Sequence, residues 1–301
     1  MSSFTILVDT NTDLPQEYFI ENDIEIIPIP FNLDGTVHAG GRWQEISDKE
    51  FYDALRDGSV AGTALINPET YARVFEEYAE KNAALLVLTL SSGLSGTYQN
   101  SVIALDDVKS KYPDCDIHTV DCSTAAGGAG LITVLAVNKR KEGLTAGETA
   151  VWLETKRNSC LSLFTVNDLM YLHRGGRLSK LSAIAGSIIG VKPLLNVAPD
   201  GTLTLKDKAR GRASALKTLV SQMKRSLNPG ASLDTVIISH TNCLEDAEAL
   251  VELIRPEVNV REFIVVMMGP VIGAHVGPGT IALFFEADMT RNEYEKKFYG
   301  G

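Results

Sequence analysis

The sequence has 301 residues, of which 45% are hydrophobic and 22% charged, a composition that supports a sizeable core and leaves room for two domains. The formal net charge of −10 at pH 7 argues against nucleic acid as the main partner, because binding to phosphates requires a basic surface. No apolar run is long enough for a membrane span, and the N-terminus lacks the basic start of a signal peptide, so we expect a cytoplasmic protein.

The first half of the chain alternates short strands and helices. Apolar strands are expected at residues 5–9, 85–90 and 117–121, and segments with the apolar spacing of helices follow them. Further helices begin at the capping pairs Ser47 with Glu50 and Thr145 with Glu148. This order of elements predicts a parallel or mostly parallel sheet.

The first strand ends in a polar run, Asp-Thr-Asn-Thr-Asp, at residues 9–13. Asp13 and Gln16 fit the N-cap of the next helix and its partner, with Pro15 in the first turn. We therefore interpret Asp9 and Asp13 as capping and turn-forming residues, and assign them no chemistry.

The stretch of residues 85–97 is the centre of this half. Its apolar run is followed by Ser-Ser-Gly-Leu-Ser-Gly and then by a helix, so residues 91–96 form a loop between a buried strand and a helix. Ligands bind at this edge of open α/β sheets, and free N–H groups, the helix dipole and serine hydroxyls suit an anion. A tight turn with capping serines accounts for the same residues, so both interpretations stay open.

The second half of the chain mixes strand–helix units with a β-hairpin at residues 194–206. This mixture implies a mixed sheet and hence a second domain. We predict an N-terminal α/β domain at residues 1–160 and a C-terminal α/β domain at residues 161–301.

Polar residues beside glycines are candidates for a binding site. They are Thr63, the 91–96 loop, residues 123–128, and His275 with the glycines after it. Arginines also flank glycines, and they are either solvated charges or a surface for an acidic partner or a phosphate: Arg174, Arg177, Arg210 and Arg212. The cysteines form no Cys-x-x-Cys pair and the histidines are scattered, so we expect free thiols, no metal and no cofactor.

Six segments follow one another in a characteristic order. They are Asp-Thr-Asn-Thr-Asp-Leu at residues 9–14, Ser-Ser-Gly-Leu-Ser-Gly-Thr-Tyr-Gln at 91–99, residues 121–128, Asp-Leu-Met-Tyr-Leu-His-Arg-Gly-Gly-Arg-Leu at 168–178, Lys-Pro-Leu-Leu at 192–195, and residues 275–279. Together they resemble the DegV family of bacterial fatty-acid-binding proteins, the acyl carriers of fatty acid kinase. The resemblance covers essentially the whole chain and implies two α/β domains with a long-chain fatty acid enclosed between them.

The resemblance also implies a site for the fatty acid carboxylate. The expected ligand-binding residues are Thr63, Ser92, Gly93, Ser95, Gly96 and His275, with Thr63, Ser95 and His275 in direct contact. A buried carboxylate must receive hydrogen bonds, which hydroxyls, loop N–H groups and an imidazolium supply. This chain has Ala64 where the family usually has a serine after the threonine, which removes one hydroxyl.

The fatty acid tail is expected to supply most of the affinity. About a dozen buried methylenes at roughly 0.8 kcal/mol each contribute on the order of 10 kcal/mol before ordering costs. The expected tail-lining residues are Ile184, Ile188, Ile189, Leu194, Ile264, Val266, Met267 and Ile272. The implied function is a non-catalytic carrier that presents the carboxylate to an ATP-dependent fatty acid kinase and then holds the acyl phosphate for an acyltransferase, with the four arginines facing the kinase.

Two other functions stay open at this point. Ser95 and His275 are a possible nucleophile and base of an acyl hydrolase, although no orienting carboxylate stands at an obvious spacing and the Gly-x-Ser-x-Gly signature is absent. Alternatively, the protein binds another small carboxylate or phosphate. The mass of the bound ligand distinguishes this third function from the first.

Overall fold

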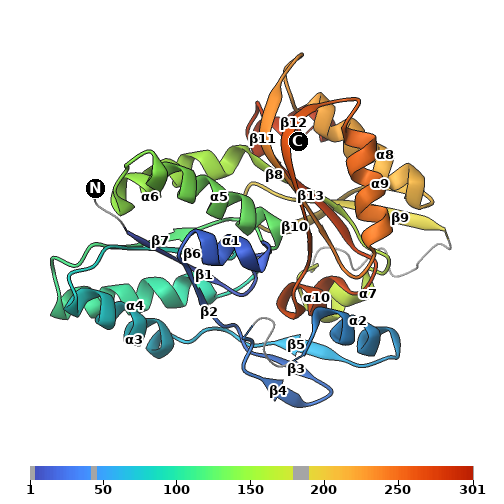
Figure 1. Cartoon of the computed structure of the whole chain (residues 1–301). Helices are drawn as coiled ribbons and strands as arrows, with labels where there is room; N and C mark the ends of the chain where they lie inside the picture. The colour runs from blue at the N-terminus through green and yellow to red at the C-terminus, as the bar shows by residue number, and fades with distance from the viewer. Residues whose placement is uncertain (1–3, 42–45, 179–189, 301) are drawn as a thin grey trace.

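The computed structural model describes residues 4–41, 46–178 and 190–300. Within these residues the strands form a parallel sheet from the first half of the chain, a mixed sheet from the second half, and a small antiparallel sheet (Figure 1). The predicted fold class, two α/β domains with a parallel and a mixed sheet, is confirmed. The division at residue 160 stays a prediction.

The N-terminal sheet has the strand order β2-β1-β6-β7, and its neighbouring strands pair in parallel. These strands are β1 (Thr5–Asp9), β2 (Ile24–Ile27), β6 (Leu85–Thr89) and β7 (Ile117–Asp121). Helix α1 (Gln16–Glu21) connects β1 to β2. Helices α3 (Pro68–Glu80) and α4 (Thr97–Lys111) pack on one face of the sheet, where Tyr71 and Phe75 fill the core. The carboxyl ends of all these strands therefore meet at one edge.

A small antiparallel sheet stands beside the two domains. It consists of β3 (Phe31–Leu33), β4 (Thr36–His38) and β5 (Ala61–Thr63), with helix α2 (Asp48–Arg56) between β4 and β5. Asp34 and Gly35 join β3 to β4 with positive φ angles of 50° and 83°, as the Asp-Gly pair predicts for a hairpin turn. The core of this unit includes Ala274 of helix α10 (Pro270–Val276), so the small sheet packs against that helix.

The C-terminal sheet has the order β10-β9-β8-β13-β11-β12, and among these described strands only β11 and β12 pair in parallel. The strands are β8 (Cys160–Thr165), β9 (Val191–Val197), β10 (Leu203–Arg210), β11 (Ser232–His240), β12 (Asn259–Met267) and β13 (Ile281–Glu286). Helices α8 (Arg212–Arg225) and α9 (Leu244–Ile254) bury the outer face. A short helix, α7 (Met170–Arg174), follows β8 and contacts α10.

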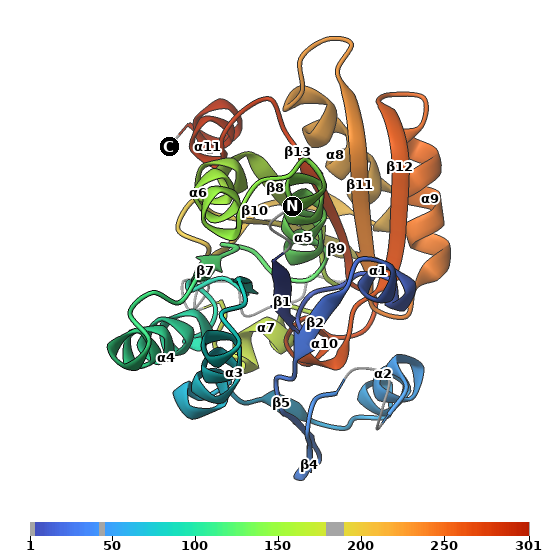
Figure 2. The same cartoon turned by 60° about the vertical axis from the view of Figure 1, so that its left-hand side comes forward.

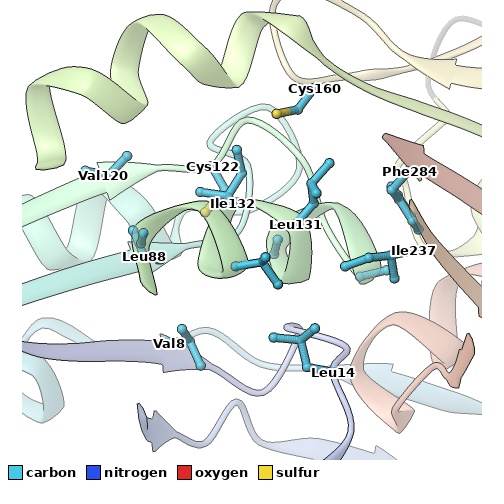
Figure 3. Close-up of a cluster of buried hydrophobic side chains, with 14 of the residues drawn as sticks. Val8, Leu14, Leu88, Val120, Cys122, Leu131, Ile132, Cys160, Ile237 and Phe284 are labelled. Carbon is cyan, nitrogen blue, oxygen red and sulfur yellow. The ribbon is translucent and has the colours of Figure 1, made fainter. Parts of the chain in front are cut away.

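Helix α5 (Gly127–Lys141) lies between the two large sheets, and α6 (Ala146–Lys156) packs beside it. Figure 3 shows α5 with Val8 and Leu14 below it and with Ile237 and Phe284 beside its right-hand end. A Cβ atom added at Gly127 would overlap Ile237 and Phe284, so the glycine permits the close approach of α5 to the C-terminal sheet.

Two features of the structure differ from the sequence-based expectations. Asp13 does not cap the helix that follows it: α1 begins after Pro15, and the Asp13 carboxylate instead accepts the Gly269 N–H at 3.0 Å, just before α10. A last helix, α11 (Arg291–Tyr299), was not predicted, although Thr290 and Glu293 form a capping box at its start. Figure 2 shows α11 at the opposite end of the molecule from the small sheet.

Candidate functional site

A cavity lies between the two large sheets, at the carboxyl edge of the N-terminal sheet. Ile29, Leu90 and Ala126, which follow β2, β6 and β7, line one side, and Phe164 of β8 and Phe284 of β13 line the other. Protein atoms leave about 770 Å³ unfilled between its walls, part of it open to solvent, and the centre of a water-sized sphere can occupy about 80 Å³ of this space. Most of the wall is apolar, so the cavity suits a hydrocarbon.

The polar side chains of the described wall fall into two groups. Ser162 shares a hydrogen bond with Thr124 at 2.9 Å, and Thr280 donates to the Val276 carbonyl at 3.0 Å, so both satisfy local partners. The other group consists of four residues from four separate segments of the chain: Thr63, Ser95, Arg177 and His275. The structure therefore brings the three predicted carboxylate contacts into one wall, together with an arginine.

These four residues mark the solvent side of the cavity. Ala64, next to Thr63 in the wall, is exposed, and Thr63 and Ser95 are partly exposed. Ser162 and Phe284, in contrast, retain only 2% and 4% of their accessible surface. The cavity is thus polar near the surface and closed by apolar side chains inside the protein.

His275 contacts Thr63 directly, with 2.8 Å between Nε2 and Oγ1. Within the described residues its other ring nitrogen, Nδ1, is buried without a hydrogen-bond partner. A proton on Nδ1 would be a buried unpaired donor, which proteins avoid, so the geometry favours the proton on Nε2 and a hydrogen bond from His275 to Thr63. The Thr63 hydroxyl proton is then left to donate to a ligand.

The His275 ring is held in an uncharged state. Burial, followed by the positive charge of Arg177, lowers the pKa of His275 to about 4, so the ring is neutral at pH 7 before a ligand binds. The sequence-based expectation of an imidazolium is corrected accordingly. The ring also packs against Gly175, where an added Cβ atom would overlap Nδ1, which accounts for the first of the two adjacent glycines.

Arg177 supplies the positive charge that His275 lacks. Its guanidinium donates to the Leu94 carbonyl at 3.1 Å and to the Gly175 carbonyl, which fixes the side chain between α7 and the serine loop. Burial lowers its pKa, but an arginine remains protonated at neutral pH. The sequence analysis placed Arg177 on a partner surface, and only the fold shows that it lines the cavity.

The three serines of the 91–96 loop have separate roles. Ser91 donates to the Gly201 carbonyl at 2.8 Å, and Ser92 donates to the Asp121 carboxylate at 2.6 Å. Only Ser95 lines the cavity, where its hydroxyl lies 3.0 Å from that of Thr97 at the start of α4. Ser91 and Ser92 therefore fit the interpretation of the loop as a tight turn, whereas Ser95 is available to a ligand.

The two loop glycines lie away from the cavity wall. Gly93 packs against the backbone of Gly201 and Thr202, so an added Cβ atom would lie 2.7 Å from the Gly201 carbonyl carbon. Gly96 is exposed at the N-cap of α4. The structure therefore places Ser92, Gly93 and Gly96 in the support of the loop, and not against the ligand space.

The other three arginines differ in exposure. Arg174 and Arg210 are exposed, and the Arg174 guanidinium lies over the Tyr171 ring. Arg212 is partly buried and pairs with Asp246 at 3.0 Å. Arg174 and Arg210 are thus free to meet a partner, whereas Arg212 is committed to an ion pair within the protein.

Of the five predicted tail-lining residues that the structure describes, one lies in the cavity wall. Ile272 lies in the cavity wall, whereas Leu194 packs on the outer face of the C-terminal sheet, among the residues under α8 and α9. Ile264, Val266 and Met267 lie on the edge strand β12, outside the described wall. The other three predicted residues, Ile184, Ile188 and Ile189, are outside the described residues.

Alternating residues of two neighbouring strands form much of the inner wall. Ser162 and Phe164 of β8 stand opposite Phe284 and Ala282 of β13. Sequence reasoning missed them because these strands are apolar on both faces, so their pattern does not identify the face that borders a cavity.

Neither a cluster of metal-ligating side chains nor a membrane-spanning helix is found in the part of the chain that the structure describes. Residues 4–41, 46–178 and 190–300 contain no group of three or more His, Cys, Asp or Glu side chains arranged to hold a metal ion. In the same ranges no helix has the length and hydropathy to span a bilayer. The four cysteines are free thiols, as expected.

The fold and the site define a class of two-domain α/β proteins that enclose an apolar cavity with hydroxyls, an imidazole and an arginine near its opening. The chain belongs to the DegV family: the family model described as "uncharacterised protein, DegV family" matches residues 3–288. A DegV domain-containing protein of Clostridium perfringens is 38% identical over 96% of this chain and 99% of its own length.

Solved structures of the same family share the fold. A Thermotoga maritima protein, whose structure is described as revealing fatty acid binding function, is 29% identical with a TM-score of 0.83, over 95% of this chain and 100% of its own. A fatty-acid-binding DegV family protein from Thermus thermophilus is 27% identical with a TM-score of 0.84, over 95% of this chain and 99% of its own. Fatty acid binding is thus described for two proteins that resemble this chain over nearly their whole length.

Proposed function

We propose that this protein binds a long-chain fatty acid in the cavity between its domains and carries it with the carboxylate near the surface. The observation that carries the proposal is the placement of Thr63, Ser95 and His275 in one wall of an otherwise apolar cavity. The fatty acid binding described for relatives at 29% and 27% identity supports it.

The polar end has the chemistry of a carboxylate site. A carboxylate accepts several hydrogen bonds, and the Thr63 and Ser95 hydroxyls are donors in this wall, where His275 donates to Thr63 Oγ1 and so leaves the Thr63 hydroxyl proton for the ligand. Arg177 provides a formal positive charge in the same wall. Because a buried carboxylate is costly without such partners, the polar end fixes the orientation of the ligand while the apolar walls take its tail.

The carrier presents its carboxylate to an ATP-dependent kinase, which forms an acyl phosphate, and then holds that product for an acyltransferase. The exposure of Ala64 and the partial exposure of Ser95 support this step, since they place the carboxyl end near solvent. Arg174 and Arg210 are the exposed cations that we assign to the kinase surface. In this proposal the protein is cytoplasmic, is not itself catalytic and uses no cofactor besides the bound fatty acid.

The geometry favours a carrier over an acyl hydrolase. Among the described residues Ser95 and His275 share no hydrogen bond: Ser95 pairs with Thr97, and the Nε2 atom of His275 pairs with Thr63. The buried Nδ1 atom of His275 faces Gly175, where a catalytic triad would place a carboxylate. A protein that binds another small anion would not need the apolar side chains that form most of the cavity wall.

Two measurements test the proposal. Native mass spectrometry of the protein purified from bacterial cells should show a bound species with the mass of a long-chain fatty acid. Delipidated protein should then bind hexadecanoate stoichiometrically and, with a bacterial fatty acid kinase and ATP, should yield an acyl phosphate that hydroxylamine converts into a hydroxamate. Persistent absence of a bound lipid together with no uptake of hexadecanoate would refute fatty acid binding, and uptake without hydroxamate would refute only the kinase step.

A further inference from the structure

The polar loop of residues 9–13, Asp-Thr-Asn-Thr-Asp, is buried to an unusual degree. Its five residues keep between 0% and 3% of their accessible surface. Burial of so many polar groups is costly unless each is hydrogen-bonded. The described cavity wall includes none of the five, so direct contact with a ligand does not explain them.

The loop hydrogen-bonds to the backbone that leads to each carboxylate contact. Asp9 accepts the N–H of Leu90 at 3.1 Å, immediately before the loop that carries Ser95. Asp13 accepts the N–H of Gly269 at 3.0 Å, immediately before helix α10, which carries His275. Two of the three predicted contacts are thus attached to one short loop through side-chain acceptors.

The third contact, Thr63, is attached less directly, through one additional backbone hydrogen bond. Thr10 Oγ1 accepts the N–H of Ile29 at 2.9 Å, and the carbonyl of the next residue, Pro30, accepts the N–H of Ala64 at 2.9 Å. Ala64 directly follows Thr63. The loop also holds the cavity wall itself, since the Asn11 side chain accepts the N–H of Ala126 at 3.2 Å.

We infer that residues 9–13 are the positioning element of the carboxylate site. They hold Thr63, Ser95 and His275 at mutually fixed positions across the domain interface. The inference rests on the proposed function, because it concerns the same site. Contact residues from three separate segments bind one carboxylate well only if their spacing is held to within about 0.5 Å, and a shared loop of buried acceptors provides that constraint. Asp13 and Thr10 are positioning residues in this scheme, since they act through α10 and through the small sheet.

The test compares a fatty acid with the fatty alcohol of the same length, because only the acid has the charged group that depends on the spacing of the three contact residues. Asp13→Leu removes the acceptor for Gly269, whereas Asp13→Asn keeps an oxygen at that position. Thr10→Val and Thr10→Ser form the matching pair for Ile29. Asp107→Leu, at an exposed position of α4, is the control for introducing a leucine. Affinities for hexadecanoate and hexadecanol are measured with delipidated full-length protein by displacement of a fluorescent fatty acid, next to thermal unfolding of each variant.

We expect Asp13→Leu and Thr10→Val to weaken hexadecanoate binding about tenfold or more, which corresponds to the loss of one charge-assisted hydrogen bond between the displaced contact residue and the carboxylate. Hexadecanol binding should change by less than about threefold. Asp13→Asn and Thr10→Ser should recover most of the acid affinity. Equal losses for acid and alcohol, or no recovery by the conservative variants, would overturn the inference and leave the loop a general packing element. If Asp13→Leu fails to fold, the Thr10 pair decides the outcome in the same way. A wild-type protein that binds neither compound would instead refute the proposed function.

Discussion

Replacement of Thr63 by valine tests the carboxylate site most directly. Valine has nearly the shape of threonine, so Thr63→Val removes the hydroxyl and leaves the packing between the small sheet and α10 in place. Since His275 Nε2 lies 2.8 Å from Thr63 Oγ1 and donates to it, the lost group is the hydroxyl proton that is directed at the ligand.

The expected loss follows from the kind of hydrogen bond removed. A hydrogen bond to a charged group contributes about 1.5–3 kcal/mol, which corresponds to roughly a 10- to 150-fold increase in Kd for the acid. The tail contacts are unchanged, and they contribute on the order of 10 kcal/mol, so the variant should still bind measurably. A ligand with a hydroxymethyl group in place of the carboxylate should lose much less, because it carries no charge.

The assay is displacement of a fluorescent fatty acid from delipidated protein by hexadecanoate and by hexadecanol, each at several concentrations. Thr218→Val is the matched control: this threonine lies on α8, and its hydroxyl donates to the Ser214 carbonyl within the helix. Wild-type affinity for hexadecanoate in Thr63→Val, or an equal loss for acid and alcohol, would contradict the assignment of Thr63 to the carboxylate.

Three further outcomes follow from the same geometry. Ser92→Ala should leave hexadecanoate affinity within about twofold, because its hydroxyl faces Asp121; a loss near that of Thr63→Val would contradict this. Arg291→Met should lower the free energy of unfolding by about 2–6 kcal/mol, since the buried guanidinium donates to the Ser123 and Cys160 carbonyls and its loss leaves two buried acceptors without this donor; unchanged denaturant unfolding would refute it. Burial lowers the pKa of His275 from 6.5 to about 4, so the unfolded state binds more protons than the folded state between these pH values. The free energy of unfolding of the ligand-free wild type should therefore rise from pH 4 to 6.5 by up to about 3 kcal/mol relative to His275→Gln. Parallel pH profiles of the two proteins would exclude this contribution.

Local signals in the sequence proved reliable. The capping boxes at Ser47 and Thr145 formed as predicted, because the pairing partners stand three residues apart and need no information from elsewhere in the chain. The buried strands β1, β6 and β7 also matched their predicted ranges, since short apolar runs between polar turns leave few alternatives.

Contacts between distant segments were harder to predict. Asp13 looks like a cap for the helix three residues later, yet it caps a segment 256 residues away, and nothing in its local sequence distinguishes the two. In β9, Leu194 and Leu195 are both apolar and both buried, so alternation does not tell which faces the partner domain; Leu194 faces α8 and Leu195 faces α5.

The three predicted carboxylate contacts came from the family resemblance, and their chemistry could not have been derived from spacing alone. Thr63 and His275 are 212 positions apart, and their contact depends on the packing of the small sheet against α10. Arg177 illustrates the opposite case, since an arginine beside glycines looks like a surface charge until the fold shows that it lines the cavity.

Helix α5 has a consequence for how the molecule can open. Because both large sheets bury an inner face against this one helix, neither half could separate from the other without wetting a continuous apolar layer. A wide hinge motion between the halves is therefore opposed by the interior itself. Under the proposed function, a fatty acid would enter and leave through smaller displacements around the cavity opening, while the two halves stay together.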